Sequence, residues 1–307
     1  MRVALICNIK SSFPLLNWLD SQGVLVGIGI KEQKTEFSND LSVICKQKKL
    51  TPQILKKENL YQQLSSWLLS IKADIVLVLG FPYKIPNDIL KIPQFGFYNI
   101  HFGKLPVYGG SFPIFWQIVN QETEAILTIH QMDLNFDAGP IAVEIPFEIN
   151  TNNTFGIVEA NYSYVTINGV FQLLDSLLRN TLSLRPQVSV KSLFFKKPSI
   201  LDIVIDWNAM PAEKILALIK ACNPWNRGAI ARINGMDVKI LEAKTIASQS
   251  RKAGEVLQIS TNGMQVSCIQ NMALNIKVIY SQFGYLEGEN LGAFGVKEGD
   301  VFESIIF

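Results

Sequence analysis

The chain has two histidines, and the short segments around them are where we first expect chemistry. His101 lies in residues 97–116 and His130 in residues 128–141. His101 follows Asn99 by two positions in FYNIH, so on a strand both side chains point to the same face. A donor amide beside a titratable imidazole is a catalytic pairing when a carboxylate converges with it. Asp137, in the segment that also contains His130, is the candidate carboxylate. A site at Asn99, His101 and Asp137 is therefore the first hypothesis.

Length and composition predict two domains without a membrane anchor. Hydrophobic cores stop growing near ~250 to 300 residues, and the chain has 307. No apolar run approaches the ~18 residues that a membrane span needs, and the first residues lack the charged start and the cleavage site of a signal peptide. We expect a soluble, cytoplasmic protein.

The cysteines and the net charge argue against two further classes of protein. Four scattered cysteines without a CxxC pair favour reduced thiols over a zinc site or a disulfide framework, and we expect no metal. A net charge of +2 is too small for a protein that grips a nucleic-acid backbone over a large area. Small lysine clusters leave open a local patch for a phosphate or polyglutamate group, with a solvated surface as the alternative.

The first part of the chain predicts a parallel sheet, since strand, helix, strand units build such sheets. No GxGxxG and no Walker lysine follow the first strand, so a classical dinucleotide site is not expected. Ligands in these sheets bind outside the carboxyl ends of the strands, and one such end is at Gly80. The apolar patterns predict buried strands at 2–9, 24–30 and 73–81 and helices at 13–19, 39–49 and 58–70.

The two segments that contain His101 and His130 are expected on strands and loops that follow this unit. After the strand that carries Asn99 and His101, Gly109 and Gly110 predict a turn, and Ser111 is a suitable cap for the next helix. Residues 137–139 predict a tight loop. Strands are expected at 96–101, 126–134 and 141–149, and a closing helix at 153–179.

Residues 180–200 predict a linker between two domains, because prolines and lysine pairs replace periodic apolar residues there. We expect an α/β fold with a Rossmann-like, mostly parallel sheet domain at 1–190. After a helix at 212–221, short strands between glycine turns predict a smaller, β-rich, barrel-like domain at 191–307.

The whole chain resembles the folate-dependent formyltransferase family, which includes enzymes that act on methionyl-tRNA, glycinamide ribonucleotide and nucleotide sugars. The shared pattern is Asn-x-His, Leu-Pro-x-Tyr-x-Gly, Pro-x-x-Trp and Asp-x-Gly-x-Ile, in that order. Residues 223–243 also resemble the barrel-like tail domain of the tRNA enzyme and of some sugar enzymes. The pattern is present here as Asn99, His101, Leu105, Pro106, Tyr108, Gly110, Pro113, Trp116, Asp137, Gly139 and Ile141.

The resemblance implies roles for three groups of residues. It implies that Asn99, His101 and Asp137 are catalytic, while His130 is expected to be a hydrogen-bonded structural histidine. Substrate choice is expected in the segment that departs from the pattern, at Phe102, Lys104 and Tyr108. The co-substrate 10-formyltetrahydrofolate is implied to contact Phe81, Tyr83, Lys84, Ile85, Ser111, Asp133, Leu134, Asn135 and Phe136.

The reaction that the resemblance implies suits the catalytic residues. A neutral amine attacks the formyl carbon, and the carbonyl oxygen becomes an oxyanion that Asn99 and a protonated His101 would stabilise as donors. Because a carboxylate raises the pKa of a nearby imidazole, we expect Asp137 to favour charged His101. Asp137 is also expected to take a proton from the amine, directly or through water.

Departures from the family pattern bear on the acceptor. The usual Ser-Leu-Leu-Pro after the histidine is replaced by residues 102–106, and a frequent arginine is replaced by Gly109. The glycine- and lysine-rich loop of the tRNA enzyme is missing, with EQKTEFSND at 32–40 in its place. We therefore expect a small-molecule amine, first a nucleotide-linked amino sugar. Methionyl-tRNA is the alternative acceptor, a folate-binding or 10-formyltetrahydrofolate-hydrolysing protein is the alternative class, and a homodimer is left open.

Overall fold

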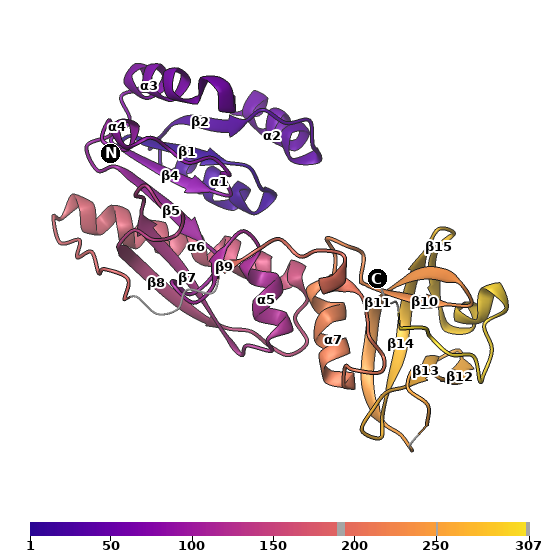
Figure 1. Cartoon of the computed structure of the whole chain (residues 1–307). Coiled ribbons are helices and arrows are strands. Elements are labelled where there is room, and N and C mark those ends of the chain that lie inside the picture. Colours follow the sequence, from indigo (N-terminus) through magenta and orange to yellow (C-terminus); the bar gives the residue numbers. More distant parts are fainter. Residues whose placement is uncertain (189–193, 250, 305–307) are drawn as a thin grey trace. The chain divides into compact units, whose positions relative to one another are not determined.

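The computed structural model describes residues 1–188, 194–249 and 251–304, and these form two compact units (Figure 1). The boundary predicted at 190 lies outside the described residues. Two segments before it, 114–123 and 149–158, belong to the second unit because they bond to its later residues. Trp116 Nε1 donates to the carbonyl oxygen of Lys196, and the amide of Gly156 donates to that of Asn223. The first unit is Met1–Pro113, Glu124–Glu148 and Glu159–Phe195, and the second is Ile114–Thr123, Ile149–Val158 and Lys196–Phe307.

The first unit is built on a seven-stranded sheet with the strand order β3-β2-β1-β4-β5-β7-β8. The first five strands of that order pair in parallel, whereas β7 and β8 run antiparallel to their neighbours. This sheet confirms the predicted α/β, mostly parallel architecture, and β3 is a strand that the pattern did not predict. The strands are β1 (Val3–Cys7), β2 (Leu25–Lys31), β3 (Gln53–Leu55), β4 (Ile75–Leu79), β5 (Phe97–His101), β7 (Glu124–Gln131) and β8 (Ile141–Glu148).

The helices of the first unit bury their apolar sides against this sheet. Helix α2 begins before its predicted start because Thr35 and Ser38 form a reciprocal cap at its first turn. In α6, a Cβ on Gly169 would lie 2.9 Å from Cδ2 of Leu127, so the glycine allows close packing on β7. The helices are α1 (Phe13–Ser21), α2 (Glu36–Gln47), α3 (Leu60–Ile71), α4 (Asn87–Leu90) and α6 (Phe155–Leu178), with 3-10 turns η1 (Lys10–Ser12) and η2 (Lys57–Asn59).

The second unit is an antiparallel β structure with the strand order β10-β11-β14-β13-β12 and with β15 paired to β14. Its helix α7 covers the residues predicted for it, 212–221. A short parallel pair, β6 (Gly109–Gly110) and β9 (Phe194–Phe195), belongs to the first unit. The elements are α5 (Pro113–Val119), α7 (Ala212–Ala221), β10 (Ala229–Ile233), β11 (Met236–Ala247), β12 (Val256–Ser260), β13 (Gly263–Ser267), β14 (Met272–Ser281), β15 (Gly284–Glu287), η3 (Leu201–Ile203) and η4 (Gly288–Gly295).

The last described residues join the two edges of this second sheet. The amide of Val256, on β12, donates to the carbonyl oxygen of Asp300, and the amide of Glu303 donates to that of Arg232, on β10. Between these bonds, Phe302 is buried with its ring centroid 5.0 Å from that of Trp207. The terminal segment thus closes the sheet into the barrel-like form that the short strands predicted.

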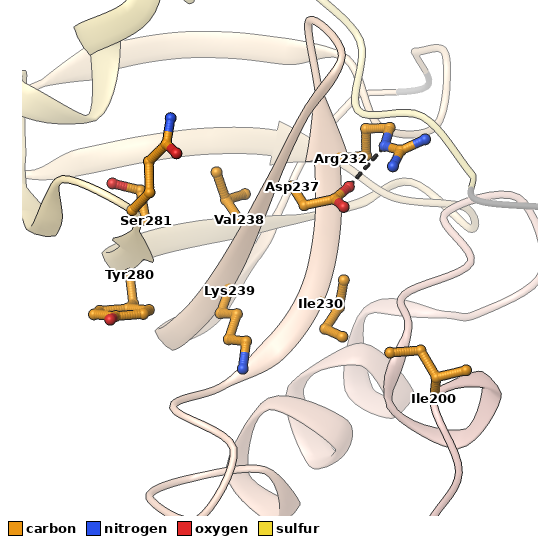
Figure 2. Close-up of a pocket in the computed structure, with 9 residues that line it drawn as sticks. Ile200, Ile230, Arg232, Asp237, Val238, Lys239, Tyr280 and Ser281 are labelled. Atoms are coloured by element: carbon orange, nitrogen blue, oxygen red, sulfur yellow. Dashed lines mark hydrogen bonds and ion pairs between the residues drawn. The ribbon is translucent and has the colours of Figure 1, made fainter.

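A cavity of about 330 Å³ lies on the outer face of β10, β11 and β14, and Figure 2 shows the residues that line it. Its charged groups already have partners. Arg232 pairs with Asp237 at 2.7 Å, and Lys239 Nζ donates to Asn226 at 2.8 Å. These charged groups at the cavity therefore take part in an ion pair or a hydrogen bond already, and they do not single it out as the site of chemistry. Within the described residues, no helix has the length and apolar character to cross a membrane.

Replacing Phe302 by alanine is expected to lower the free energy of unfolding by about 3 to 5 kcal/mol, because a cavity is left beside Trp207. The matched control is Phe283→Ala, since Phe283 is 66% exposed whereas Phe302 is 2% exposed. The control should change stability by only about 0.5 kcal/mol. Urea unfolding followed by circular dichroism measures both variants, and equal losses would contradict closure of the barrel by the terminal segment.

Candidate active site

The register of β5 against β7 brings the chemistry-bearing side chains together. Asn99 lies opposite His130 and His101 lies opposite Thr128. Residues directly opposite in an antiparallel pair share a face of the sheet, and residues two apart on one strand do so as well. Asn99, His101 and His130 therefore gather on one face, at the carboxyl end of β5.

The loop after β7 adds a carboxylate to these three nitrogen-bearing side chains. Oδ1 of Asp137 is 3.3 Å from Asn99 Nδ2 and 3.7 Å from both His101 Nδ1 and His130 Nε2. The structure thus brings together the three residues predicted to be catalytic. It also brings in His130, which the sequence suggested only as a structural histidine.

Asp137 is held in a left-handed backbone conformation, with φ of 53°. The amide of Gly110 donates to its Oδ2 at 2.9 Å. Gln187 Nε2 donates to the carbonyl oxygens of Asp137 and Gly139, both at 2.8 Å. Gln187 lies in the stretch predicted as linker, where Arg185 exchanges two backbone hydrogen bonds with Ile141. This stretch is therefore part of the site's support, which periodicity alone did not reveal.

Asp137 is ionised at neutral pH. Burial of its carboxyl by itself raises the pKa, but the neighbouring His101 and His130 rings, whenever they carry a second proton, and the donating amide of Gly110 lower it below its ordinary value. A carboxylate with such a low pKa is a stable anion and a weak proton acceptor.

His101 is neutral at neutral pH, because burial lowers its pKa by more than the Asp137 carboxylate raises it. The expectation that Asp137 keeps His101 charged is therefore wrong. The ring is 6% exposed, and its Nε2 lies 2.7 Å from the carbonyl oxygen of Tyr108. Since a carbonyl oxygen only accepts, Nε2 carries the proton and Nδ1 presents a lone pair on the side of Asp137.

His130 has the opposite tautomer. Its Nδ1 lies 3.1 Å from the carbonyl oxygen of Gln131, so Nδ1 carries the proton. Its Nε2 then accepts from Asn99 Nδ2, at 3.1 Å. The site therefore holds one carboxylate, one amide and two imidazoles, and the His130 ring presents its Nε2 lone pair to Asn99.

The residues predicted to contact folate lie in two loops that meet. Lys84 Nζ lies 5.5 Å from the ring centroid of Phe136, and the Phe81 and Tyr83 rings pack edge to face at 5.2 Å. Leu134 and Phe136 are exposed large apolar side chains, whereas Ile85 is 3% exposed in the core under β4. The contact of Ile85 with folate stays a prediction.

The remaining residues of the predicted folate set lie on the surface. Ser111 is exposed, and its amide donates to the carbonyl oxygen of Phe195. Asp133 accepts from the amide of Asn135 at 2.8 Å, which shapes the loop before Asp137. Among the residues that the structure describes, no group of three or more His, Cys, Asp or Glu side chains could hold a metal ion.

Two of the three residues predicted to bind substrate are buried by aromatic packing. Phe102 stacks on Tyr162 at 4.8 Å, and Tyr108 stacks on Phe195 at 5.1 Å. Their side chains are only 7% and 6% exposed, and their contact with substrate stays a prediction. Lys104 is exposed, as a substrate-contacting residue must be.

Two family models match the chain. The model described as formyl transferase matches residues 29–172, and the one described as formyl transferase, C-terminal domain, matches residues 201–282. Together they span both the sheet unit and the barrel.

Similar proteins come from two groups. Methionyl-tRNA formyltransferase of Nitrosospira multiformis is 29% identical over 236 residues, which are 76% of this chain and 73% of that protein. The Clostridium beijerinckii protein of the same name is 30% identical over 210 residues, 67% of each chain. The solved structure of WlaRD, a sugar 3N-formyl transferase with dTDP and 5-N-formyl-THF, shares the fold with a TM-score of 0.66 at 18% identity. That match covers 90% of this chain and 97% of that one.

The pKa of His101 is expected to lie below its ordinary value of 6.5, and Asp137→Asn should lower it further because an anion that favours the imidazolium is lost. Since the chain has two histidines, an NMR titration of histidine-labelled protein shows only two rings, which a His130→Gln variant assigns. The control is Asp175→Asn, an acidic residue that pairs with Arg179 elsewhere. A pKa at or above 6.5 would contradict a neutral His101.

Replacing Gly110 by alanine is expected to destabilise the protein by about 1 to 3 kcal/mol, since its φ is 111° and a Cβ would lie 2.1 Å from the carbonyl oxygen of Phe195. Gly109→Ala is the matched control, because the nearest atoms to its Cβ lie at 3.9 Å and its φ is not positive. Urea unfolding compares the two. Equal stability of both variants would mean that the Gly110 backbone does not hold Asp137 in place.

Proposed function

Because this chain belongs to the formyl transferase family, we propose that it transfers a formyl group from 10-formyltetrahydrofolate to a primary amine of a small molecule. The observation that carries the proposal is the meeting of Asn99, neutral His101 and ionised Asp137 at the carboxyl end of β5. This is the edge at which α/β sheets bind their ligands.

The two loops beside the site suit a folate. The Phe81 and Tyr83 rings and the exposed Leu134 and Phe136 offer apolar surface to a flat pterin, next to Asp137. Apolar walls with a few polar groups are the usual lining of small-molecule sites. WlaRD, whose fold this chain shares, was solved with 5-N-formyl-THF, which supports the same class of ligand here.

His101 is the residue that takes the proton in the proposed mechanism. The neutral amine attacks the formyl carbon, a C–N bond forms, and the carbonyl electrons move to oxygen, where an N–H of Asn99 stabilises the charge. Nδ1 of His101 accepts the proton of the amine, and the ionised Asp137 stabilises the resulting imidazolium. His101 then returns the proton to N10 of the folate as the C–N10 bond breaks, which releases tetrahydrofolate and the formamide.

This assignment changes the roles expected from the sequence. A charged His101 would be a donor and could not accept a proton, but burial keeps it neutral. Asp137, whose pKa lies below its ordinary value, is the weaker acceptor and the better counter-ion. The pair therefore acts as base and electrostatic support, as a histidine and a buried carboxylate do in other acyl transfers.

A nucleotide-linked amino sugar is the acceptor that we favour. WlaRD is a sugar N-formyl transferase solved with dTDP. In addition, the segment that replaces the lysine-rich loop of the tRNA enzymes is acidic, and its Glu36 and Asp40 pair with Lys10 at 2.7 Å. Such a surface does not attract a phosphate backbone. Methionyl-tRNA is the second candidate, because the relatives from Nitrosospira multiformis and Clostridium beijerinckii carry that name.

Release of tetrahydrofolate from 10-formyltetrahydrofolate is expected to accelerate when an amino-sugar nucleotide is added and to stay at the background rate with methionyl-tRNA. The measurement is an absorbance assay with a panel of both acceptors, and mass spectrometry of the formylated product. Acceleration by methionyl-tRNA alone would favour the second candidate. Release of formate without any acceptor would instead indicate a hydrolase.

His101→Asn and Asp137→Asn are expected to lower kcat by about 100-fold or more, since the first removes the base and the second removes the anion that stabilises the imidazolium. The matched control is Asp175→Asn, which removes an exposed carboxylate from α6 and should leave kcat unchanged. Wild-type rates in His101→Asn would refute the mechanism.

A further inference from the structure

The two ends of an asparagine amide are chemically opposite, since its nitrogen donates and its oxygen accepts, and a half-turn of the amide exchanges them. Nδ2 of Asn99 faces His130 Nε2 at 3.1 Å and Asp137 Oδ1 at 3.3 Å. An amide nitrogen only donates, so both of these groups act as acceptors, His130 through the lone pair on Nε2 and Asp137 through its carboxylate oxygen. The NH₂ end of Asn99 is therefore held on the inner side of the site by two partners.

We infer that His130 is a positioning residue that anchors one N–H of Asn99 and thereby aims the other at the oxygen of the formyl group. The inference rests on the proposed function and adds to it the orientation of the oxyanion donor.

The two hydrogen atoms of Nδ2 are not held equally. The contact with His130 is the shorter one, and His130 is only 2% exposed, so water does not compete for this bond. The contact with Asp137 is longer, and its Oδ1 also has His101 Nδ1 and His130 Nε2 at 3.7 Å. The N–H on the Asp137 side is thus the one that an oxyanion can capture.

The anchor matters most at the moment of proton transfer. Once His101 Nδ1 has accepted the amine proton, it becomes the strongest donor to Asp137 Oδ1. Asn99 is then held by His130 alone. Without a lone pair at position 130, the amide is free to turn and present its oxygen to the oxyanion, which repels it.

The test is a set of variants at two positions. His130→Phe removes the lone pair, whereas the amide oxygen of His130→Gln can accept from Asn99. We expect His130→Phe to lower kcat by about 10- to 100-fold, approaching the loss of an oxyanion donor, with KM changed by less than about threefold. His130→Gln should retain kcat within about fivefold of wild type, because it restores the acceptor.

A double-mutant cycle separates positioning from a general structural role. If His130 acts through Asn99, the His130→Phe/Asn99→Ala double variant has the same kcat as Asn99→Ala alone. Multiplicative losses, a kcat loss in His130→Gln as large as in His130→Phe, or a rise in KM with kcat unchanged would each overturn the inference. Should His130→Phe not fold, His130→Leu removes the same lone pair with less bulk.

A second readout needs no activity, so failure of the proposed function and failure of this inference can be told apart. If no acceptor is formylated by the wild-type protein, the proposed function fails. The anchoring is then judged from the side-chain amide signals of Asn99 in the resting protein, assigned by their loss in Asn99→Ala. These NMR signals should shift in His130→Phe and stay near wild type in His130→Gln. Unchanged signals in His130→Phe would overturn the inference.

Discussion

The carboxylate of Asp137 is the interaction on which the rest of the site depends. Its side chain is 14% exposed, and a charge so far from water is stable only if donors replace the lost hydration. Gly110 and Asn99 supply these donors, and Gln187 fixes the backbone that carries the charge. This requirement accounts for three features. They are the glycine at 110, the left-handed backbone at 137 and the hydrogen bonds that Gln187 makes to the Asp137 loop.

The Asp137 anion determines where a proton is stabilised during the proposed reaction. Because burial keeps His101 unprotonated, Asp137 has no full positive partner at rest. A proton that arrives on His101 Nδ1 creates that partner at 3.7 Å, and the interaction strengthens because water is largely excluded. The resting site is therefore preorganised for a charge that appears only during the reaction, which is how electrostatic preorganisation lowers a barrier.

The sequence predicted what depends on local pattern and missed what depends on register. Apolar runs located the strands of the parallel sheet except β3, and the spacing of Asn99 and His101 placed them on one face. His130 could not be added to them, because only the pairing of β5 with β7 sets it opposite Asn99. Gln187 reaches Asp137 across fifty positions of sequence without any periodic signal. The protonation state of His101 could not be predicted from the sequence pattern either, since it depends on how deeply the ring is buried.

The segment between His101 and Ser111 shows how one loop divides its residues between packing and selectivity. The side chains of Phe102 and Tyr108 stack on other aromatic rings. Gly110 has a positive φ and lies close to the Phe195 backbone, which requires glycine there. At Gly109, by contrast, the nearest atoms to a Cβ lie at 3.9 Å, which is ordinary van der Waals contact. Lys104 is exposed in this loop, so under the proposed function it is the cation that an acidic acceptor would meet there.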